Sequence, residues 1–332
     1  QMGYDKNRQG KFELRTDLAL ERRESFPGDG GEVSGVSLEK KQLGQGNVSL
    51  TEVKILDEAG AKAMKKPVGA YLTLEADCLL KEDEEGHGQA AKELAACIRE
   101  MTAQMIGKKR LEENDFFLLV AGLGNAEVTP DSLGPEVTGK LSVTGYLRNW
   151  EGRDLLKEEK LPGIGAIAPG VMAQTGMETA EILRGIIGEV KPSLVIAIDA
   201  LAACSLKRLG TTIQLTDTGI HPGSGVGNHR QGLTGESLGV PVLAIGVPTV
   251  IGVTSIVHDT FWALSQVLAS CETTKNAGNW MQDMGYEEQR QLLYELLEPE
   301  MGVLYVTPPD IDKTISRLGN VISEGIHRAF LA

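Results

Sequence analysis

The sequence predicts an α/β fold, a three-layer α/β/α sandwich with a mainly parallel sheet. Apolar runs of strand length alternate with helix-like stretches, and strands that are apolar throughout are typical of a parallel sheet covered on both faces. The composition agrees, because 41% of the residues are hydrophobic and the 40 glycines suit many tight turns between strands and helices. The strand-like runs lie at 116–125, 194–201, 211–215 and 241–248, and the helix-like stretches lie near 133–148 and 175–189.

Two more strands and three more helices complete the predicted fold. Residues 48–56 and 69–76 carry β-branched and aromatic residues at strand spacing, with a charged turn between them, and predict a small β extension near the amino terminus. An acidic surface loop is expected at 81–88. Apolar residues at helical spacing predict a helix with a buried face, an amphipathic helix and a final helix that packs on the sheet. In that order, the apolar residues of the three helices are Leu94, Ile98, Met101 and Met105; Val257, Phe261, Leu264 and Leu268; and Ile311, Ile315, Leu318, Ile322 and Ile326.

Length, charge and cysteine usage narrow the class of protein. The 332 residues can form one domain with a substantial core, and residues 1–17 and 22–35 are expected to form a polar arm and a flexible loop. The net charge of −13 disfavours direct binding to nucleic acid. No stretch resembles a signal peptide or a membrane span, so we expect a cytoplasmic protein with no membrane partner. The four cysteines stand singly, as expected of reduced thiols.

Common cofactor and catalytic motifs are incomplete or missing from the sequence. The glycine turn at 122–125 (GLGN) resembles the start of a dinucleotide-binding motif, but Glu127 stands where the third glycine or alanine belongs. The sequence also lacks a G-x-x-x-x-G-K-S/T phosphate loop, a G-x-S-x-G serine hydrolase motif and an HExxH zinc motif. We therefore expect no cofactor, and we expect the glycine turn to let the chain leave a strand sharply.

Two aspartates stand where the predicted fold would place active-site groups. Asp131 and Asp199 each follow an apolar run and precede a helix-like stretch, so both should lie at the carboxyl edge of the sheet, where open α/β folds bind ligands. Asp131 could instead cap the helix that follows it. Asp199 lies within the apolar sequence VIAIDAL, where burying a carboxylate is costly without a partner or a function. A close carboxylate pair can share a proton and supply an acid and a base at one pH.

Two glycine-rich loops are further candidates for the site. Residues 217–228 (DTGIHPGSGVGN) follow a predicted strand, and residues 165–179 turn into a helix whose free N–H groups could hold an anion. Either segment could also be an ordinary ordered loop. The residues that we expect to line a cleft beside the aspartates are Asn125, His221, Gly223 and Ser224.

From about residue 12 to its end, the sequence resembles the germination protease family of spore-forming bacteria. The resemblance rests on long ordered matches, which are RTDLALE, GLGNAEVTPDSLGP, AIAPGVMAQTG, VIAIDALAA, DTGIHPGSGVGN and AIGVPTV. It implies an endopeptidase that initiates the degradation of small acid-soluble spore proteins during germination. The catalytic aspartates of the family fall on Asp131 and Asp199. The resemblance also implies an unusual aspartic mechanism with no metal, in which one carboxylate activates a water and the other, protonated, polarises the scissile carbonyl.

The resemblance further implies processing, assembly and location. Members of the family are made as inactive precursors that remove their own amino-terminal segment, cutting after an acidic residue and before a hydrophobic residue and Ala. Asp17, Leu18 and Ala19 fit this pattern, so the implied processing site is the bond between Asp17 and Leu18. Residues 1–17 would then be a propeptide and 18–332 a single protease domain. The implied assembly is a homo-oligomer, a tetramer, in the forespore and spore core, with spore proteins and not DNA as direct partners.

Two other functions remain open on the sequence alone. The resemblance extends to the fold of hydrogenase maturation proteases, in which two acidic residues and a histidine hold a metal. A metal-dependent peptidase using Asp131, Asp199 and His221 would lose activity with a chelator. A non-enzymatic receptor for small anions would use the glycine loops and helix starts, and would survive mutation of either aspartate. For the aspartic protease, a fall in pH is the expected trigger of processing, because it protonates one carboxylate of the pair.

Overall fold

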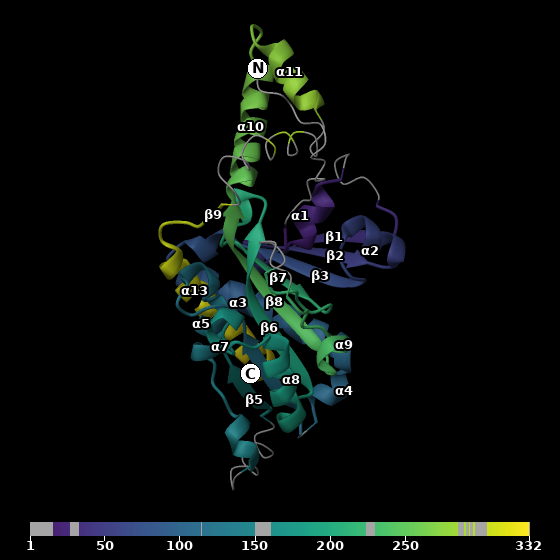
Figure 1. Ribbon diagram of the computed structural model, residues 1–332, viewed down its shortest axis with the longest axis vertical. Coiled ribbons are helices and arrows are strands. Elements are labelled where there is room, and N and C mark those ends of the chain that lie inside the picture. Colours follow the sequence, from purple (N-terminus) through teal and green to yellow (C-terminus); the bar gives the residue numbers. More distant parts are fainter. Residues whose placement is uncertain are drawn as a thin grey trace.

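One large sheet forms the centre of the molecule (Figure 1). The computed structural model describes residues 16–26, 33–113, 115–149, 161–223, 230–284 and 304–331, together with Gln289, Leu292 and Glu295. Within these residues, nine strands lie in the order β1-β2-β3-β7-β8-β6-β4-β5, and β9 pairs with the end of β8. The strands are β1 (Val36–Leu43), β2 (Val48–Ile55), β3 (Gly69–Glu75), β4 (Phe117–Gly122), β5 (Gly163–Ile167), β6 (Leu194–Ala203), β7 (Thr212–Thr216), β8 (Val242–Gly252) and β9 (Tyr305–Val306).

The sheet has a parallel half and an antiparallel half. Strands β8, β6, β4 and β5 run parallel to one another, and the apolar sequences of β8, β6 and β4 predicted this arrangement. Strands β7, β3, β2 and β1 continue the sheet in antiparallel order, so the predicted pair β2 and β3 is part of the main sheet. Strand β1 was not predicted, because its sequence VSLEKKQL is mostly polar and its central residues are exposed. Polar, charged residues suit a strand at the sheet edge.

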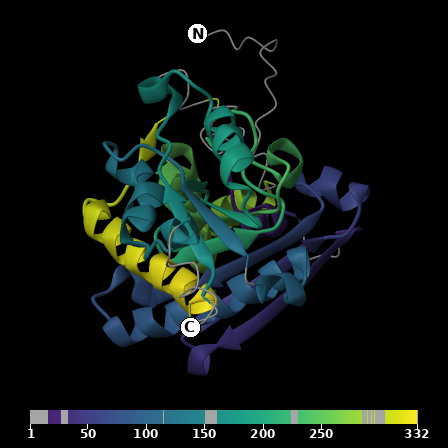
Figure 2. The same ribbon diagram turned by 90° about the horizontal axis from the view of Figure 1, so that it is seen from below.

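Helices cover both faces of the sheet, which confirms the three-layer sandwich. Alternate residues of a strand point to opposite faces, so Val120 and Ile196 join one core while Leu119 and Val195 join the other. The final helix α13 lies beside α3 on the first face (Figure 2), and its predicted isoleucine face is buried. The first face carries α3 (Glu84–Ile106), α5 (Leu133–Lys140) and α13 (Ile311–Phe330), and the second carries α8 (Thr179–Val190) and α9 (Gly235–Leu238).

Three predicted loops or turns contain helix. Asp57 begins α2 (Glu58–Met64) inside the expected turn, because its carboxylate accepts a hydrogen bond from Gly60 N at 2.8 Å. Asp83 begins α3 in the same way, by accepting from Gly86 N at 2.9 Å, so the acidic loop expected at 81–88 is helical from Glu84. The loop expected at 22–35 is also shorter, since α1 (Ala19–Glu24) includes its first residues.

Two stretches between β4 and β6 also differ from expectation. The helix expected near 133–148 ends at Lys140 and is followed by the 3-10 helix η4 (Gly145–Asn149). Strand β5 was not predicted, because GIGAI is short and contains two glycines, which are poor strand formers. The remaining short helices are α4 (Lys108–Leu111), α7 (Met172–Thr175), η1 (Gly44–Gly46), η2 (Asp77–Leu80) and η5 (Leu206–Arg208).

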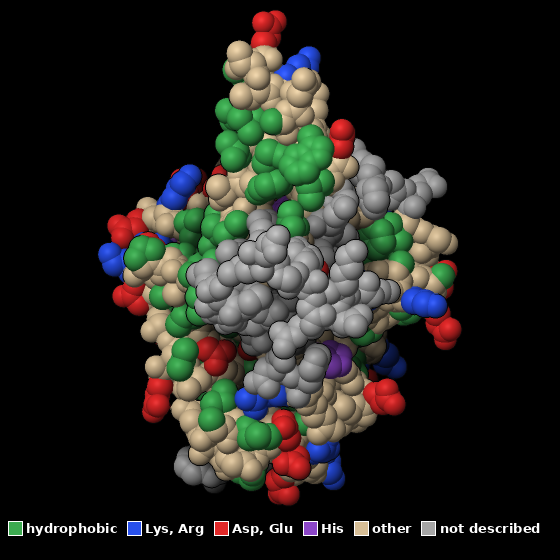
Figure 3. Space-filling view, turned by 45° about the horizontal axis from the view of Figure 1, so that its top comes forward, with side chains coloured by type: hydrophobic (Ala, Val, Ile, Leu, Met, Phe, Trp, Pro, Cys, Tyr) green, Lys and Arg blue, Asp and Glu red, His purple; other side chains and the backbone are tan. Residues whose placement is uncertain are grey.

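A pair of helices, α10 (Val253–Ser270) and α11 (Lys275–Asp283), projects beyond the sheet (Figure 1). The predicted amphipathic helix therefore forms, but Leu264 of its apolar stripe is 50% exposed. Trp262, Val267 and Trp280 are also exposed, and hydrophobic side chains are visible on this projection in Figure 3. Apolar spacing predicted the helix correctly but did not predict what the helix contacts.

The four cysteines lie in different environments. Cys97 and Cys204 are buried, Cys78 is partly buried and Cys271 is exposed, and each of the four is a free thiol. In the ranges given above, no helix combines the length and the low polarity that crossing a bilayer requires.

Replacing Ile322 tests the contribution of α13 to the core. Its side chain is fully buried in the core that α13 shares with α3, α5 and the sheet. Ile322→Ala should lower the free energy of unfolding by about 2–5 kcal/mol, because the truncation loses apolar burial and leaves a cavity. Denaturant unfolding measures the change. Lys313→Ala, at an exposed position of the same helix, should change it by no more than about 0.5 kcal/mol. Equal losses for the two variants would contradict this role of α13.

Candidate active site

Asp199 lies where one neighbouring strand ends and the other continues. On one side, β4 pairs with β6 only as far as Gly122, which lies opposite Ile198. On the other side, β8 pairs with Asp199 through Gly246 and continues beyond it. Asp199 is therefore 5% exposed, yet its strand has a free side where β4 has ended. Asp199 lies at the carboxyl edge that the end of β4 forms, as predicted. Its own strand β6 runs on to Ala203, however, so no helix follows Asp199 directly.

Asp131 is placed by the glycine turn that follows β4. The turn brings Asn125 N to Asp131, whose Oδ2 accepts its hydrogen bond at 2.8 Å. Gly124 has a φ of +102°, and a Cβ there would lie 2.0 Å from the carbonyl oxygen of Asp131, so the turn requires glycine. Asp131 ends the 3-10 helix η3 (Thr129–Asp131), and the next helix, α5, has Ser132 at its N-cap with no side-chain cap bond. Asp131 therefore does not cap α5.

Both aspartates line one cleft of about 380 Å³. Gly223 of the 217–228 loop, Gly170 of the 165–179 segment and Arg230 line the same cleft. The turn after β4, residues 200–202 of β6 and the end of β8 also line it. The structure thus brings together the two aspartates and parts of both glycine-rich segments that the sequence singled out.

Burial gives the two carboxyl groups unusual proton affinities. The pKa of Asp199 is raised well above its usual value, first by burial and then by the negative charges of Asp131 and Asp17. The pKa of Asp131 is also raised by burial, but the N–H of Asn125 and the charge of Arg230 oppose the increase. Asp199 therefore holds its proton at a higher pH than an ordinary aspartate does, while Asp131 has two groups that stabilise its charged form.

The other predicted site residues have different positions. Asn125 contributes its N–H to Asp131, and its side-chain Oδ1 accepts from Gln174 Nε2 at 2.8 Å, so it supports the cleft without lining it. His221 lines a smaller cavity, of about 70 Å³, and its pKa is lowered by burial and then by the charge of Lys66. Ser224 lies outside the described residues.

His221 is not gathered with the aspartates into a metal site. In the described part of the chain, no group of three or more His, Cys, Asp or Glu side chains has an arrangement that could hold a metal ion. Asp131, Asp199 and His221 are all among the described residues, so the donor set of a metal-dependent peptidase does not fit this arrangement.

The amino-terminal segment enters the cleft beside Asp199. Asp17 N donates to Ala202 O at 3.2 Å, and Ala202 N donates to Asp17 Oδ2 at 2.9 Å, so Asp17 is held against the end of β6. Asp17 also lines the cleft. The next residue, Leu18, is fully buried against Leu201 and Ala203. The residue before the bond that the resemblance marks for processing therefore lines the same cleft as the candidate catalytic pair.

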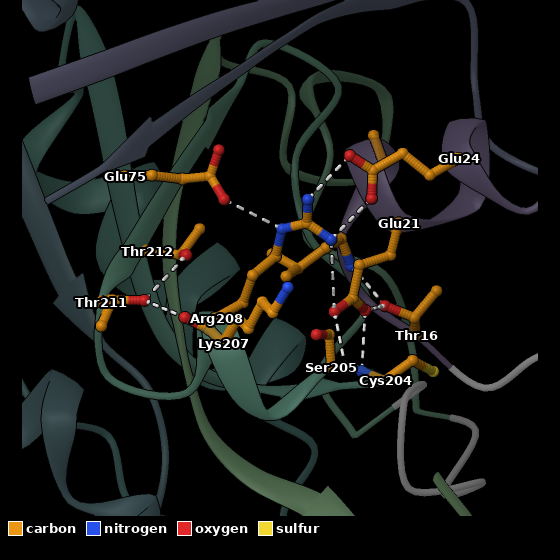
Figure 4. A network of polar contacts seen from close by, with 12 residues as sticks. Thr16, Glu21, Glu24, Glu75, Cys204, Ser205, Lys207, Arg208, Thr211 and Thr212 are labelled. Carbon is orange, nitrogen blue, oxygen red and sulfur yellow. Dashed lines mark hydrogen bonds and ion pairs between the residues drawn. The ribbon is translucent and has the colours of Figure 1, made fainter. Parts of the chain in front are cut away.

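A buried polar network fastens α1 directly behind this bond (Figure 4). Glu21 accepts hydrogen bonds from Cys204 N at 2.8 Å, Ser205 N at 3.0 Å and the Thr16 hydroxyl. Burial raises the pKa of Glu21, and these hydrogen bonds oppose the increase. Arg208 lies 3.8 Å from Glu21 and pairs with two more carboxylates. These are Glu24 at 2.8 Å and Glu75 at 3.1 Å.

Comparison with known proteins gives a consistent family. A model described as germination protease matches residues 14–279. The germination protease of Caldanaerobacter subterraneus subsp. tengcongensis is 46% identical over 318 residues, covering 95% of this chain and 94% of the relative. The germination protease of Clostridium perfringens strain SM101 is 39% identical over 320 residues, covering 96% of this chain and 95% of the relative.

Among solved structures, a [NiFe] hydrogenase maturation protease, HycI from Thermococcus kodakarensis, matches 45% of this chain and 80% of its own length. It is 20% identical, and the TM-score of 0.28 is too low to establish a shared fold. The family model and the relatives span most of the chain, including both candidate aspartates. The chain therefore belongs to the germination protease family.

Proposed function

We propose that this protein is a self-processing endopeptidase that initiates the degradation of small acid-soluble spore proteins during germination. Asp131 and Asp199 are its paired catalytic carboxylates. The observation that carries the proposal is the shared cleft, which contains both aspartates and Asp17, the acidic residue before the expected processing bond. Family membership supports peptide-bond hydrolysis, and the raised pKa values of both aspartates support acid–base work by the pair.

The two aspartates have different roles in this proposal. Asp199 is the acid, because its pKa is raised the most strongly by burial and by neighbouring negative charges. It protonates the leaving amine. Asp131 is the base, because Asn125 N–H and Arg230 favour its charged form. It takes a proton from the attacking water.

The proposal also covers organisation and partners. Residues 1–17 are the propeptide and 18–332 the protease domain, so a chain that retains Asp17 is a zymogen. The substrates are small acid-soluble spore proteins in the forespore and spore core, and the enzyme assembles as a homotetramer. With a net charge of −13, the protein is suited to meet protein substrates and not a DNA duplex.

Isosteric replacement of each aspartate tests the catalytic pair. In mass spectrometry after incubation at mildly acidic pH, the wild type should lose residues 1–17, with or without a chelator. Asp131→Asn and Asp199→Asn should each slow this loss by about 10²–10⁴-fold or more, because each removes a proton-transfer group.

Asp217→Asn is the matched control. Asp217 is also partly buried, has a raised pKa and accepts a backbone hydrogen bond, from Ala70 N at 2.9 Å, but it does not line the cleft. It should be processed at the wild-type rate. Inhibition by the chelator would instead indicate a metal-dependent peptidase, and unchanged processing in both cleft variants would indicate a non-catalytic cleft.

The rate of processing should rise as the pH falls, because the proposed acid, Asp199, must be protonated. The raised pKa of Asp199 keeps its proton above the range of an ordinary aspartate, and this proton is lost as the pH rises through that pKa. Processing should therefore accelerate as the pH falls from neutral to mildly acidic, and slow again once Asp131 is protonated. A series of quenched time courses from pH 4 to pH 8 measures it. A rate that is the same at neutral and mildly acidic pH would rule out this assignment.

Asp199→Asn should also change stability in a pH-dependent way. A carboxyl group with a raised pKa in the folded state contributes stability that is full below its unfolded pKa and is lost as the pH rises through the folded pKa. Asn carries no charge at any pH, so the variant should be more stable than the wild type at neutral pH and similar to it below about pH 4. Denaturant unfolding at the two pH values measures the difference. A variant that is less stable at both would mean that Asp199 is held by favourable partners instead.

A further inference from the structure

The carbonyl oxygen of Asp17 has two side-chain donors. Lys66 Nζ donates to it at 2.9 Å, and Gln214 Nε2 donates to it at 3.2 Å. This oxygen belongs to the bond between Asp17 and Leu18. Two preorganised donors on one carbonyl oxygen are the arrangement that enzymes use to stabilise the charge of a tetrahedral intermediate.

We propose that Lys66 and Gln214 form the oxyanion-binding pair of this protease, holding the carbonyl oxygen of the Asp17–Leu18 bond and the negative charge that develops on it. The inference rests on the proposed function, since it requires that this bond is the one hydrolysed.

Gln214 is held rigidly in the sheet and contacts the chain on both sides of Leu18. It lies on β7 between β3 and β8, paired with Thr73 and Gly246, and is 6% exposed. Its Nε2 donates to Asp17 O, and its Oε1 accepts from Ala19 N at 2.7 Å. The side-chain amide of Gln214 therefore binds the carbonyl oxygen of Asp17 and the backbone N–H group of Ala19. Such a two-point contact sets the orientation of the peptide between them.

Lys66 reaches the same oxygen from the end of α2. Lys65, the residue before it, has a φ of +51° and ends the helix, and Pro67 follows, so the backbone around Lys66 is constrained. Burial lowers the pKa of Lys66, while the charge of Asp17 opposes the decrease. An ammonium group removed from water interacts more strongly with a developing negative charge than one in solvent.

The two donors and the two catalytic aspartates line different cavities, and Asp17 lies between them. Asp17 lines both the cleft that contains Asp131 and Asp199 and the smaller cavity that contains Lys66 and Gln214. The carbonyl oxygen contacts the donors of the smaller cavity, which leaves the larger cleft for the attacking water.

The chemical step balances with water as the only co-reactant. The water oxygen bonds to the carbonyl carbon of Asp17 while one proton passes to the basic carboxylate, and the carbonyl electron pair moves onto the oxygen held by Lys66 and Gln214. The electron pair on that oxygen then re-forms the C=O bond as the C–N bond breaks. The C–N electron pair stays on the nitrogen of Leu18, and the acidic carboxyl protonates that nitrogen. The products are a new α-carboxyl group on Asp17 and a new α-amino group on Leu18.

Lys66→Met and Gln214→Leu test the pair in the full-length chain. Each removes a donor, so each should slow the loss of residues 1–17 in mass spectrometry by about 10²–10³-fold. Lys66→Arg keeps a donor and should recover part of the rate. Lys62→Met and Gln42→Leu are matched controls at exposed positions of α2 and β1, and both should process at the wild-type rate.

Hydrogen exchange separates stabilisation of the intermediate from simple attachment of the segment. The amide of Ala19 and the peptide covering α1 should stay protected in Lys66→Met, because Gln214, Glu21 and Arg208 still hold the segment. Slow processing with protection retained supports the pair. Slow processing with protection lost would mean that Lys66 only fastens the segment, and would overturn its role.

The proposed function and the pair fail in different ways. Wild-type processing that Asp199→Asn abolishes but Lys66→Met leaves at the normal rate would overturn the oxyanion pair and leave the carboxylate pair in place. If Gln214→Leu does not fold, Lys66→Met and Lys66→Arg decide the question. If the wild type is not cut between Asp17 and Leu18 at any pH, the proposed processing and the pair are both wrong.

Discussion

The early end of β4 is the constraint on which the candidate site depends. Up to Gly122, β4 and β6 are paired, and Leu123 N still donates to Ile198 O at 2.7 Å. Beyond that point the chain turns away through Gly124, whose positive φ excludes most side chains. The same turn leaves one side of Asp199 unpaired and closes on Asp131. A single glycine turn therefore opens the cleft and places the second carboxylate at its wall.

Strand β6 connects the candidate catalytic pair to the amino-terminal segment. It carries Asp199, and three residues later Ala202 holds Asp17 through two hydrogen bonds. Just beyond its end, Cys204 N and Ser205 N hold Glu21 of α1. Residues before and after the expected processing bond are thus fixed to one rigid element. Hydrolysis would not by itself release the new amino terminus, because Leu18 stays fully buried and α1 keeps its network.

The sequence identified the parts of the site that carry a local signal. A carboxylate inside an apolar strand and a polar loop after a glycine turn are recognisable without a structure, and both led to residues of the cleft. The direction of His221 has no such signal, because it depends on how its loop closes. Lys66 and Gln214 meet Asp17 across 49 and 197 residues of sequence. Only the buried amide within the strand-like TTIQL could have drawn attention to Gln214.

The charge of Asp17 links substrate preference to the acid of the pair. Its carboxylate is one of the groups that raise the pKa of Asp199. An acidic residue before the bond therefore favours the protonated form of Asp199, which is the form that can donate a proton to the leaving amine. Once the segment leaves, this contribution disappears and only burial and Asp131 remain. A substrate with an acid at this position restores it, so the preference for an acidic residue that the family resemblance implies has an electrostatic basis in addition to the hydrogen bond from Ala202 N.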